Sequence, residues 1–251
     1  MKLIFLPFFS LTFHAISLFG FNYDGFYLND TIFLNDPNHQ KILRTNFQKQ
    51  VDQINSIEFS PSLSALLHHI PITAVRIISP MGKTVTDWRA RYHPLKTPLP
   101  ISGSIELNTV YYSNSNYNPT YSNSLLHEFM HAIHDIYIPA GMMSPKIIGF
   151  YTDAKKYGCY GYSDKLALIK NRSSFPHKEY LFYNPQEFFA CTASTFLLGT
   201  SIRHPFLREE IENEQPEYFA FLQKLFDPNA SIEDSNFNPI NNWYHLEHST
   251  Y

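Results

Sequence analysis

The chain has 251 residues and fits one large domain, or one domain with a short N-terminal addition. Hydrophobic residues make up 44% of it and aromatic residues 16%, which is enough to build a substantial core. The formal net charge is −3, and the sequence contains no run of lysine or arginine. The composition therefore gives no indication of nucleic-acid binding or of a polybasic membrane patch, and we expect neither partner.

The N-terminal segment MKLIFLPFFSLTFHAISLFG has one lysine followed by an apolar run. A proline and several polar residues interrupt this run, which is too short for a membrane-spanning helix. The pattern is typical of a secretory signal peptide, with residues 15–17 (AIS) as a small-x-small cleavage site. We therefore expect a signal peptide over residues 1–17, extending to about residue 20, and a single secreted domain over 21–251 with no membrane anchor. A buried N-terminal helix is the alternative.

Two helices are the first elements expected after this segment. Apolar residues recur at helical spacing over residues 40–57. Ser60 as N-cap and Pro61 in the first turn predict a second, short helix that ends at His69. Three strands are then predicted, the first of them rich in β-branched residues, over residues 72–79, 84–91 and 101–112.

A polar cluster lies inside the apolar segment LLHEFMHAIHD, residues 125–135, which we expect to form a helix that begins near residues 122–123. His127 and His131 are four residues apart and project from one stripe of that helix, with Glu128 beside them. Apolar residues cover the rest of its circumference, so the helix is predicted to be buried nearly all round. Buried imidazoles and a buried carboxylate need partners, and a divalent metal ion would satisfy them.

The pattern His-Glu-x-x-His on a helix is a zinc-hydrolase signature. Neutral imidazole nitrogens suit Zn²⁺, and a catalytic zinc site has three protein ligands and a fourth position for water. His127 and His131 are the predicted ligands, while Glu128, beside the metal but not bound to it, is the predicted general base. A structural zinc site is another possibility, although it would not need Glu128 next to the metal.

Two further polar residues, His134 and Asp135, follow on the same helix. His134 lies about 10 Å from His127 along a helix axis, too far for one metal ion to bind both together with His131. We therefore interpret His134 as a residue at the rim of the site or behind its ligands. Asp135, one turn beyond His131, is placed to orient an imidazole, and a solvated helix-end residue is the alternative.

The C-terminal half is predicted to contain two further helices. Residues 139–178 are expected to be irregular, with a short helix over 163–170 as one option. The segment NPQEFFACTASTFLLG predicts a helix with Asn184 as N-cap and Gly199 at its end. Residues 215–226 show helical spacing of apolar residues. The order of elements indicates an α+β fold, mostly helical with a small mixed sheet.

Glu187, in the otherwise apolar helix after Asn184, is the best residue for a third metal ligand. A buried glutamate in such a helix needs a cation, and two histidines with one glutamate form a known type of catalytic zinc site. The alternative is a capping box, in which the Glu187 side chain folds back onto the backbone of Asn184. The residues alone leave both possibilities open.

The segments HEFMHAIHD (residues 127–135) and YLFYNPQEFFA (residues 180–190) resemble the catalytic domain of the anthrax lethal factor family, which includes the secreted Pro-Pro endopeptidases. The resemblance covers about residues 70–226, with specific motifs only in these two segments. It implies a zincin-like fold and a zinc-dependent endopeptidase. Cleavage next to proline is implied at the level of the family only.

Residue by residue, the resemblance assigns one zinc ion and five residues of its site. The ligands would be His127, His131 and Glu187, and Glu128 would be the base. Tyr180, seven residues before Glu187, matches the tyrosine that hydrogen-bonds the zinc-bound water or the oxyanion in the family. A core aromatic residue is the alternative interpretation of Tyr180.

The chain also departs from the family pattern. Cys191 replaces an acidic residue one turn after the third ligand, and we interpret it as a packing residue because a further ligand would close the open position. The separation of His127 from Glu187 is longer than in the relatives, which indicates an insertion over residues 140–178. Cys159 and Cys191 could form a disulfide or remain two separate buried residues.

The expected substrate is a protein or peptide bound in extended form along an edge strand that faces the active-site cleft. Residues 103–108 are the segment we assign to that edge, and an ordinary interior strand is the alternative. The function predicted overall is a secreted zinc endopeptidase. A catalytically silent, toxin-associated binding module that keeps the zincin fold is the alternative from another class.

Overall fold

The structure is a computed structural model, which describes residues 20–76, 89–97, 102–116, 123–162, 180–201 and 205–230. The predicted signal peptide over residues 1–17 and the short helix considered over 163–170 lie outside the described residues. Most of the strand predicted over 84–91 and the end of the strand predicted over 72–79 lie outside them as well.

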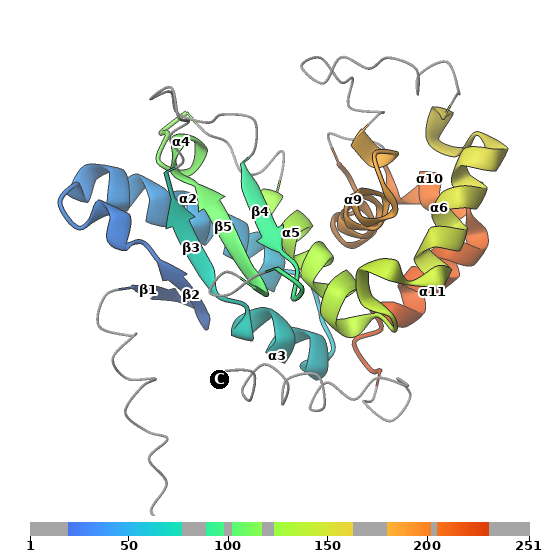
Figure 1. The fold of residues 1–251 in the computed structure, drawn as a ribbon, viewed down its shortest axis with the longest axis horizontal. Coiled ribbons are helices and arrows are strands. Elements are labelled where there is room, and N and C mark those ends of the chain that lie inside the picture. The colour runs from blue at the N-terminus through green and yellow to red at the C-terminus, as the bar shows by residue number, and fades with distance from the viewer. Residues whose placement is uncertain are drawn as a thin grey trace, which may run out of the picture.

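A mixed, five-stranded sheet forms one side of the described part (Figure 1). Its strands are β1 (Phe21–Tyr23), β2 (Phe26–Asn29), β3 (Ile72–Val75), β4 (Ala90–His93) and β5 (Ser104–Asn108). They follow the spatial order β1-β2-β3-β5-β4, with parallel pairs β2–β3 and β3–β5 and antiparallel pairs β1–β2 and β4–β5. Together with the helices, this sheet confirms the predicted α+β fold.

β4 is the edge strand that lies next to the helix carrying His127 and His131, called the metal-motif helix below. β5 pairs with β3 on one side and with β4 on the other, where Tyr92 lies opposite Ile105. The assignment of residues 103–108 to the edge is therefore wrong, because neighbours cover β5 on both sides. The alternation of apolar and polar residues along a strand indicates which face of the sheet each side chain lies on. It carries no information about which strands lie next to one another.

Helices make up most of the remaining described chain. They are α2 (Pro37–Asn55), α3 (Pro61–His69), α4 (Thr109–Tyr112), α5 (Ser124–Ala132), α6 (Pro145–Tyr157), α9 (Pro185–Leu198), α10 (Arg208–Glu214) and α11 (Pro216–Leu225). The helices predicted over 40–57 and 215–226, the helix from Pro61 to His69, the metal-motif helix and the helix after Asn184 are all present. The strand predicted over 101–112 ends at Asn108, whose side chain accepts from Val110 N–H and caps α4.

α6 lies in a stretch that was expected to be irregular, and α10 was not predicted. Within α6 only Ile147 and Ala154 are buried, so its apolar stripe is narrow and its helical period is weak. The signals that could have found it are at its ends. Pro145 stands in the first turn, and Gly158 follows the last residue in a left-handed conformation, with φ of 71°.

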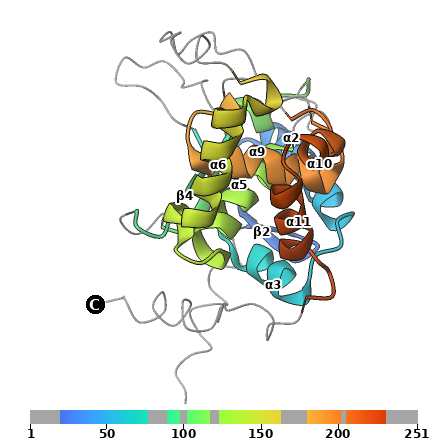
Figure 2. The same ribbon diagram turned by 90° about the vertical axis from the view of Figure 1, so that its right-hand side faces the viewer.

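α5 lies between the sheet and the other helices of the C-terminal half. It packs along β4 on one side and against α9 on the other (Figure 1). Figure 2 shows α6, α9, α10 and α11 grouped on the side away from the sheet. Among the described residues, no helix combines the length and the apolar character needed to cross a membrane. The metal-motif helix therefore sits where the two halves of the fold meet.

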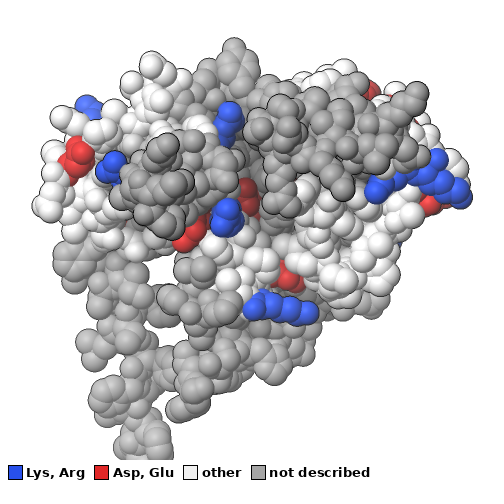
Figure 3. All heavy atoms as spheres, turned by 45° about the horizontal axis from the view of Figure 1, so that its top comes forward, with Lys and Arg blue, Asp and Glu red and all other residues white. Residues whose placement is uncertain are grey.

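Charged side chains of both signs are interspersed over the described part of the face drawn in Figure 3. This arrangement is what an ordinary solvated surface shows when basic and acidic residues are mixed rather than segregated. On the described part of this face, no patch of a single charge marks a binding site for a charged partner.

Candidate metal centre

The start of α5 is fixed by a cap and by a buried polar network. The Asn123 side chain accepts from Leu126 N–H at 2.7 Å and donates to the backbone carbonyl of Gln50 on α2 at 3.1 Å. The side-chain oxygen of Gln50 accepts from Leu125 N–H at 2.8 Å and from Tyr112 OH at 3.0 Å. These bonds satisfy N–H groups that the first turn of a helix leaves free and hold α5 in register against α2.

The start of α9 separates the two interpretations of Glu187. Asn184 Oδ1 accepts from Glu187 N–H at 2.7 Å, so the asparagine alone caps the helix. The carboxylate of Glu187 does not fold back onto the cap but reaches α5, where Oε2 lies 3.1 Å from His127 Nε2. The geometry thus favours the ligand interpretation over the capping box.

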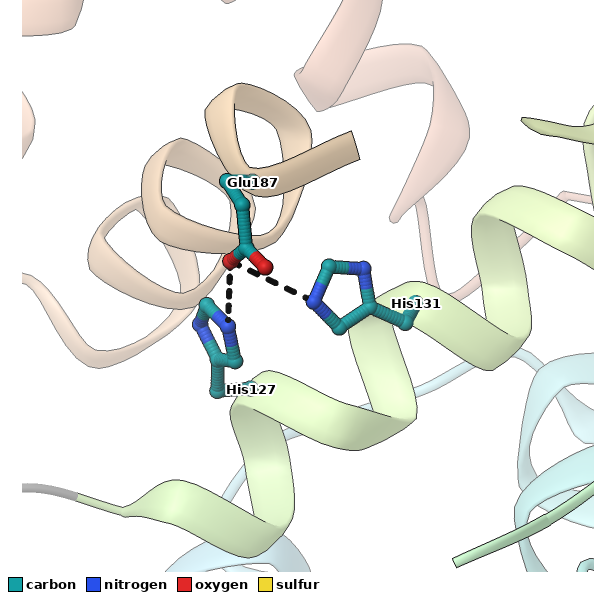
Figure 4. Close-up of side chains that lie close together, drawn as sticks. All are labelled: His127, His131 and Glu187. Carbon is teal, nitrogen blue, oxygen red and sulfur yellow. Dashed lines mark hydrogen bonds and ion pairs between the residues drawn. The ribbon is translucent and has the colours of Figure 1, made fainter. Parts of the chain in front are cut away.

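Three side chains converge between α5 and α9. Figure 4 shows His127 and His131 pointing from one face of α5 toward Glu187 on α9. Glu187 Oε2 is 3.1 Å from His127 Nε2 and 3.5 Å from His131 Nε2, and the three ligand atoms lie within 4.8 Å of one another. Ligands about 2.1 Å from a tetrahedral Zn²⁺ are about 3.4 Å apart, so only small side-chain shifts would let this group hold the ion.

The charges of Glu187 and His131 stabilise each other across the site. Burial alone would raise the pKa of Glu187, but hydrogen bonds from His127 and His131 outweigh it and hold that pKa well below its usual range. Burial likewise opposes the charged form of His131, yet the hydrogen bond and charge of Glu187 raise its pKa above the ordinary value. A divalent cation would replace these protons as the partner of the carboxylate.

Glu128 lies beside this group and is only 7% exposed. Its Oε2 accepts from the backbone N–H of Tyr92, on the edge strand β4, at 2.7 Å. Glu128 is therefore held by the sheet rather than by the histidines, and it does not belong to the group of three possible ligands. Tyr92 was not foreseen as a site residue, because no local pattern in its strand marks it.

Tyr180 is brought to the same place. Its ring centroid lies 6.0 Å from that of His127. Burial raises the pKa of the Tyr180 phenol, and the charges of Glu187 and Glu128 raise it further. The hydroxyl therefore stays protonated and can act as a hydrogen-bond donor within the site.

Asp135 does not orient an imidazole, so that expectation is corrected. Its Oδ2 accepts from Tyr92 OH at 3.1 Å and from Leu95 N–H at 2.8 Å. The physical reason is its place on the helical segment. Asp135 follows Glu128 by seven residues, close to two full turns, and both carboxylates face Tyr92 of β4. Residues Ile133–Tyr137 form a π-helical turn after α5.

His134 lies in the same π-helical turn and is fully buried, so it does not lie at the rim, and of the two positions expected for it only the one behind the ligands stays open. Its ring packs against Phe189 with centroids 5.0 Å apart. Among the described residues, neither ring nitrogen has a hydrogen-bond partner. Burial, together with the nearby charge of His131, lowers the pKa of His134 to about 3, so its imidazole is neutral.

The two cysteines are separate. Cys159 and Cys191 are both buried, and no disulfide joins them, so the alternative of two separate buried residues holds. Cys191 is 5% exposed and lies near the phenols of Tyr180 and Tyr218, whose pKa values respond to it. It stands outside the group of possible metal ligands, as expected for a packing residue.

Comparison with known proteins gives one distant likeness. No protein-family model matches the chain, and no curated protein matches it. A solved structure, the Pro-Pro endopeptidase from Paenibacillus alvei, is similar with a TM-score of 0.41 and 13% sequence identity, over 75% of this chain and 100% of that chain. At such a distance, the chemistry of the site has to be judged from its own side chains.

Proposed function

We propose that the protein is a secreted zinc-dependent endopeptidase of the lethal-factor-like type. The observation that carries the proposal is the convergence of His127, His131 and Glu187, with ligand atoms within 4.8 Å of one another, beside the buried carboxylate of Glu128 and the half-buried phenol of Tyr180. Three protein ligands leave a tetrahedral zinc ion with one open position, which is the pattern of catalytic rather than structural sites.

A Zn²⁺ held by these residues would act as a Lewis acid and lower the pKa of a water molecule toward about 7. Glu128 is the group that receives the proton of that water. Its Oε2 already accepts from Tyr92 N–H, so the other carboxylate oxygen is the one available for the proton. The oxygen of that water would add to the carbonyl carbon of the substrate, and Glu128 would deliver the proton to the amine as the carbon–nitrogen bond breaks, which gives a carboxylate and a free amine.

Tyr180 supplies the second polar contribution in this proposal. Its protonated phenol lies beside Glu187 and close to the ring of His127. A donor in this position would stabilise the negative charge that develops on the carbonyl oxygen of the substrate. Since that charge exists only in the transition state, the contact would raise kcat more than it lowers KM.

The substrate proposed is an extended peptide of a protein, paired with the outer edge of β4. The β4–β5 register turns the backbone groups of Arg89 and His93 toward β5 and those of Ala90 and Tyr92 outward. Because Glu128 takes the N–H of Tyr92, the outward groups left for a peptide are the N–H and carbonyl of Ala90 and the carbonyl of Tyr92.

Secretion is proposed from the signal-like segment over residues 1–17. N-terminal sequencing of the protein recovered from the medium of its native host should begin at about residue 18. Protein that stays inside the cell with Met1 in place would contradict the proposed secretion and would leave the proposed catalytic activity unaffected.

The decisive experiment measures metal and cleavage together. Purified protein should contain one zinc ion per chain by elemental analysis, and it should cleave members of a random peptide library, with products identified by mass spectrometry. A chelator should abolish cleavage, and added zinc should restore it. Folded protein without stoichiometric zinc whose cleavage survives the chelator would refute the metallopeptidase. Zinc-loaded protein that cleaves no peptide would favour the silent binding module.

A further inference from the structure

We propose that Asp135 is a positioning residue for the general base. It holds the edge strand β4 against α5, so that the backbone N–H of Tyr92 fixes the carboxylate of Glu128. The catalytic consequence rests on the proposed function, whereas the contact between β4 and α5 can be tested without it.

The first step concerns Glu128. A glutamate side chain has several rotatable bonds, and a buried carboxylate needs donors to offset the loss of water. The donor here is Tyr92 N–H, at 2.7 Å from Oε2, a charge-assisted hydrogen bond in a buried setting. The orientation of the base therefore depends on where β4 lies.

The second step concerns the direction of that N–H group. In the antiparallel β4–β5 pair, Asn108 N–H donates to Arg89 C=O at 2.9 Å and Gly103 N–H donates to His93 C=O at 2.8 Å. Alternate residues of the strand point their backbone groups the other way. Tyr92 thus presents its N–H to α5, and a lateral shift of β4 would withdraw it from Glu128.

The third step is the attachment of β4 to α5. β4 has four residues, and no described strand pairs with its outer edge. Asp135 Oδ2 accepts from Tyr92 OH at 3.1 Å and from Leu95 N–H at 2.8 Å, so a single carboxylate oxygen binds the strand and the chain just beyond it. Asp135 and Glu128, seven residues apart on one side of the helical segment, therefore hold Tyr92 at its side chain and at its backbone.

A variant pair that separates the two bonds of Asp135 provides the first test. Asp135→Ala removes both bonds, and Tyr92→Phe removes only the one from the phenol while keeping the ring. Glu106→Gln is the matched control, because it removes the ion pair between Glu106 and His93 at 2.9 Å, in the same β4–β5 pair, and leaves Tyr92 alone. Amide hydrogen exchange of Tyr92 is the readout that needs no catalysis.

Exchange at Tyr92 should be about tenfold or more faster in Glu128→Ala, where the acceptor is gone, and in Asp135→Ala, where the strand is released. Tyr92→Phe should give a smaller acceleration, and Glu106→Gln should match wild type. Wild-type exchange at Tyr92 in Asp135→Ala would overturn the proposal. If Asp135→Ala does not fold, Tyr92→Phe decides, and unchanged exchange there is the contrary result.

A double-mutant cycle, measured as kcat on a cleaved peptide, then tests whether Asp135 acts through the position of Glu128 or through the stability of the fold. Asp135→Ala should lower kcat by about tenfold or more with little change in KM and full zinc occupancy, because a misplaced base is costly to the chemical step. In a Glu128→Ala background the same change should alter the residual kcat less than about twofold. An equal loss in both backgrounds would mean that Asp135 acts through the fold and not through the base. If no peptide is cleaved, the proposed function fails, and the exchange measurement still decides the contact.

Discussion

His131 and His134 are three residues apart in the chain, yet their imidazoles meet opposite surroundings. His131 faces the carboxylate of Glu187, and its pKa is raised although the side chain is buried. His134 faces the ring of Phe189, and its pKa falls to about 3. Burial disfavours the charged form at both positions, so the neighbouring carboxylate accounts for the difference. The acidic partner that α9 supplies therefore distinguishes His131, a candidate ligand, from His134.

Among substitutions that would remove this difference between the two histidines, we expect the largest loss of zinc and of activity at Glu187. Glu187→Ala removes the partner of His127 and His131, so the protein should lose stoichiometric zinc and retain less than about 1% of its peptide hydrolysis. Elemental analysis and the peptide assay measure both. Glu217→Ala is the matched control, since Glu217 is also a first-turn glutamate of a helix with an N-terminal proline but is exposed. Full zinc in Glu187→Ala would show that the third ligand has been misassigned.

The next effect separates the base from the ligands. Glu128→Ala should keep its zinc, because Glu128 is held by Tyr92 N–H and lies outside the group of three converging atoms. Hydrolysis should nevertheless fall by about 10²-fold or more, the scale of lost general-base catalysis. Zinc content and kcat are measured on the same preparation. Equal loss of zinc in Glu128→Ala and Glu187→Ala would contradict the division of roles.

Tyr180→Phe removes one hydroxyl and keeps the ring near His127. We expect kcat to drop by roughly 10²-fold with KM, zinc content and melting temperature near wild type, because the contact would strengthen only in the transition state. A core aromatic residue would instead lose at most one hydrogen bond, about 1 kcal/mol of stability, and keep its activity. Near-normal kcat would therefore remove Tyr180 from the site.

The pH dependence of zinc binding sharpens the contrast between the two histidines. In the metal-free protein the raised pKa of His131 contributes stability below its unfolded pKa of about 6.5, and that contribution is lost as pH rises through the higher folded pKa. Zinc needs the neutral imidazole, so its affinity should rise with pH in the same window, by up to about tenfold per unit for one released proton. Calorimetric zinc titrations in buffers of different ionisation enthalpy measure the number of protons released on binding. Affinity that is flat across the window would contradict the coupling.

The smallest effect is expected at His134. Its imidazole is neutral, buried and without a hydrogen-bond partner among the described residues. His134→Leu exchanges it for an apolar side chain of similar volume, which should change the free energy of unfolding by about 1 kcal/mol or less, in either direction. Thermal unfolding and zinc analysis test this. Loss of zinc in this variant would mean that His134 supports the ligands after all.

The parts of the fold that local chemistry determines were predictable. Asn184 and Gly199 mark the two ends of α9 in the sequence, and the spacing of His127 and His131 predicts that both side chains lie on one face of α5, as they do. The role of Glu187 was not decidable from the sequence alone, because an N3 glutamate suits both a capping box and a metal site. Only the direction of its carboxylate, away from Asn184 and toward α5, separates them.

The missed features are non-local. The placement of β5 inside the sheet depends on which strands pair with it, and that information lies in β3 and β4 rather than in residues 104–108. Asp135 was expected to orient an imidazole because it lies one turn beyond His131. It also lies seven residues after Glu128, and the partners that both carboxylates find on β4 cannot be read from the sequence of α5. No single residue of the π-helical turn over Ile133–Tyr137 announces that turn either.

The packing of α5 against α9 has a consequence for how the protein reaches its working state. The proposed ligands His127 and Glu187 are 60 residues apart in the chain, so bringing them together requires the closure of a long loop. A zinc ion could recover that entropic cost only after the buried side chains of the two helices had docked. The ion should therefore bind late, to a chain that is already nearly native, and slow unfolding rather than speed folding.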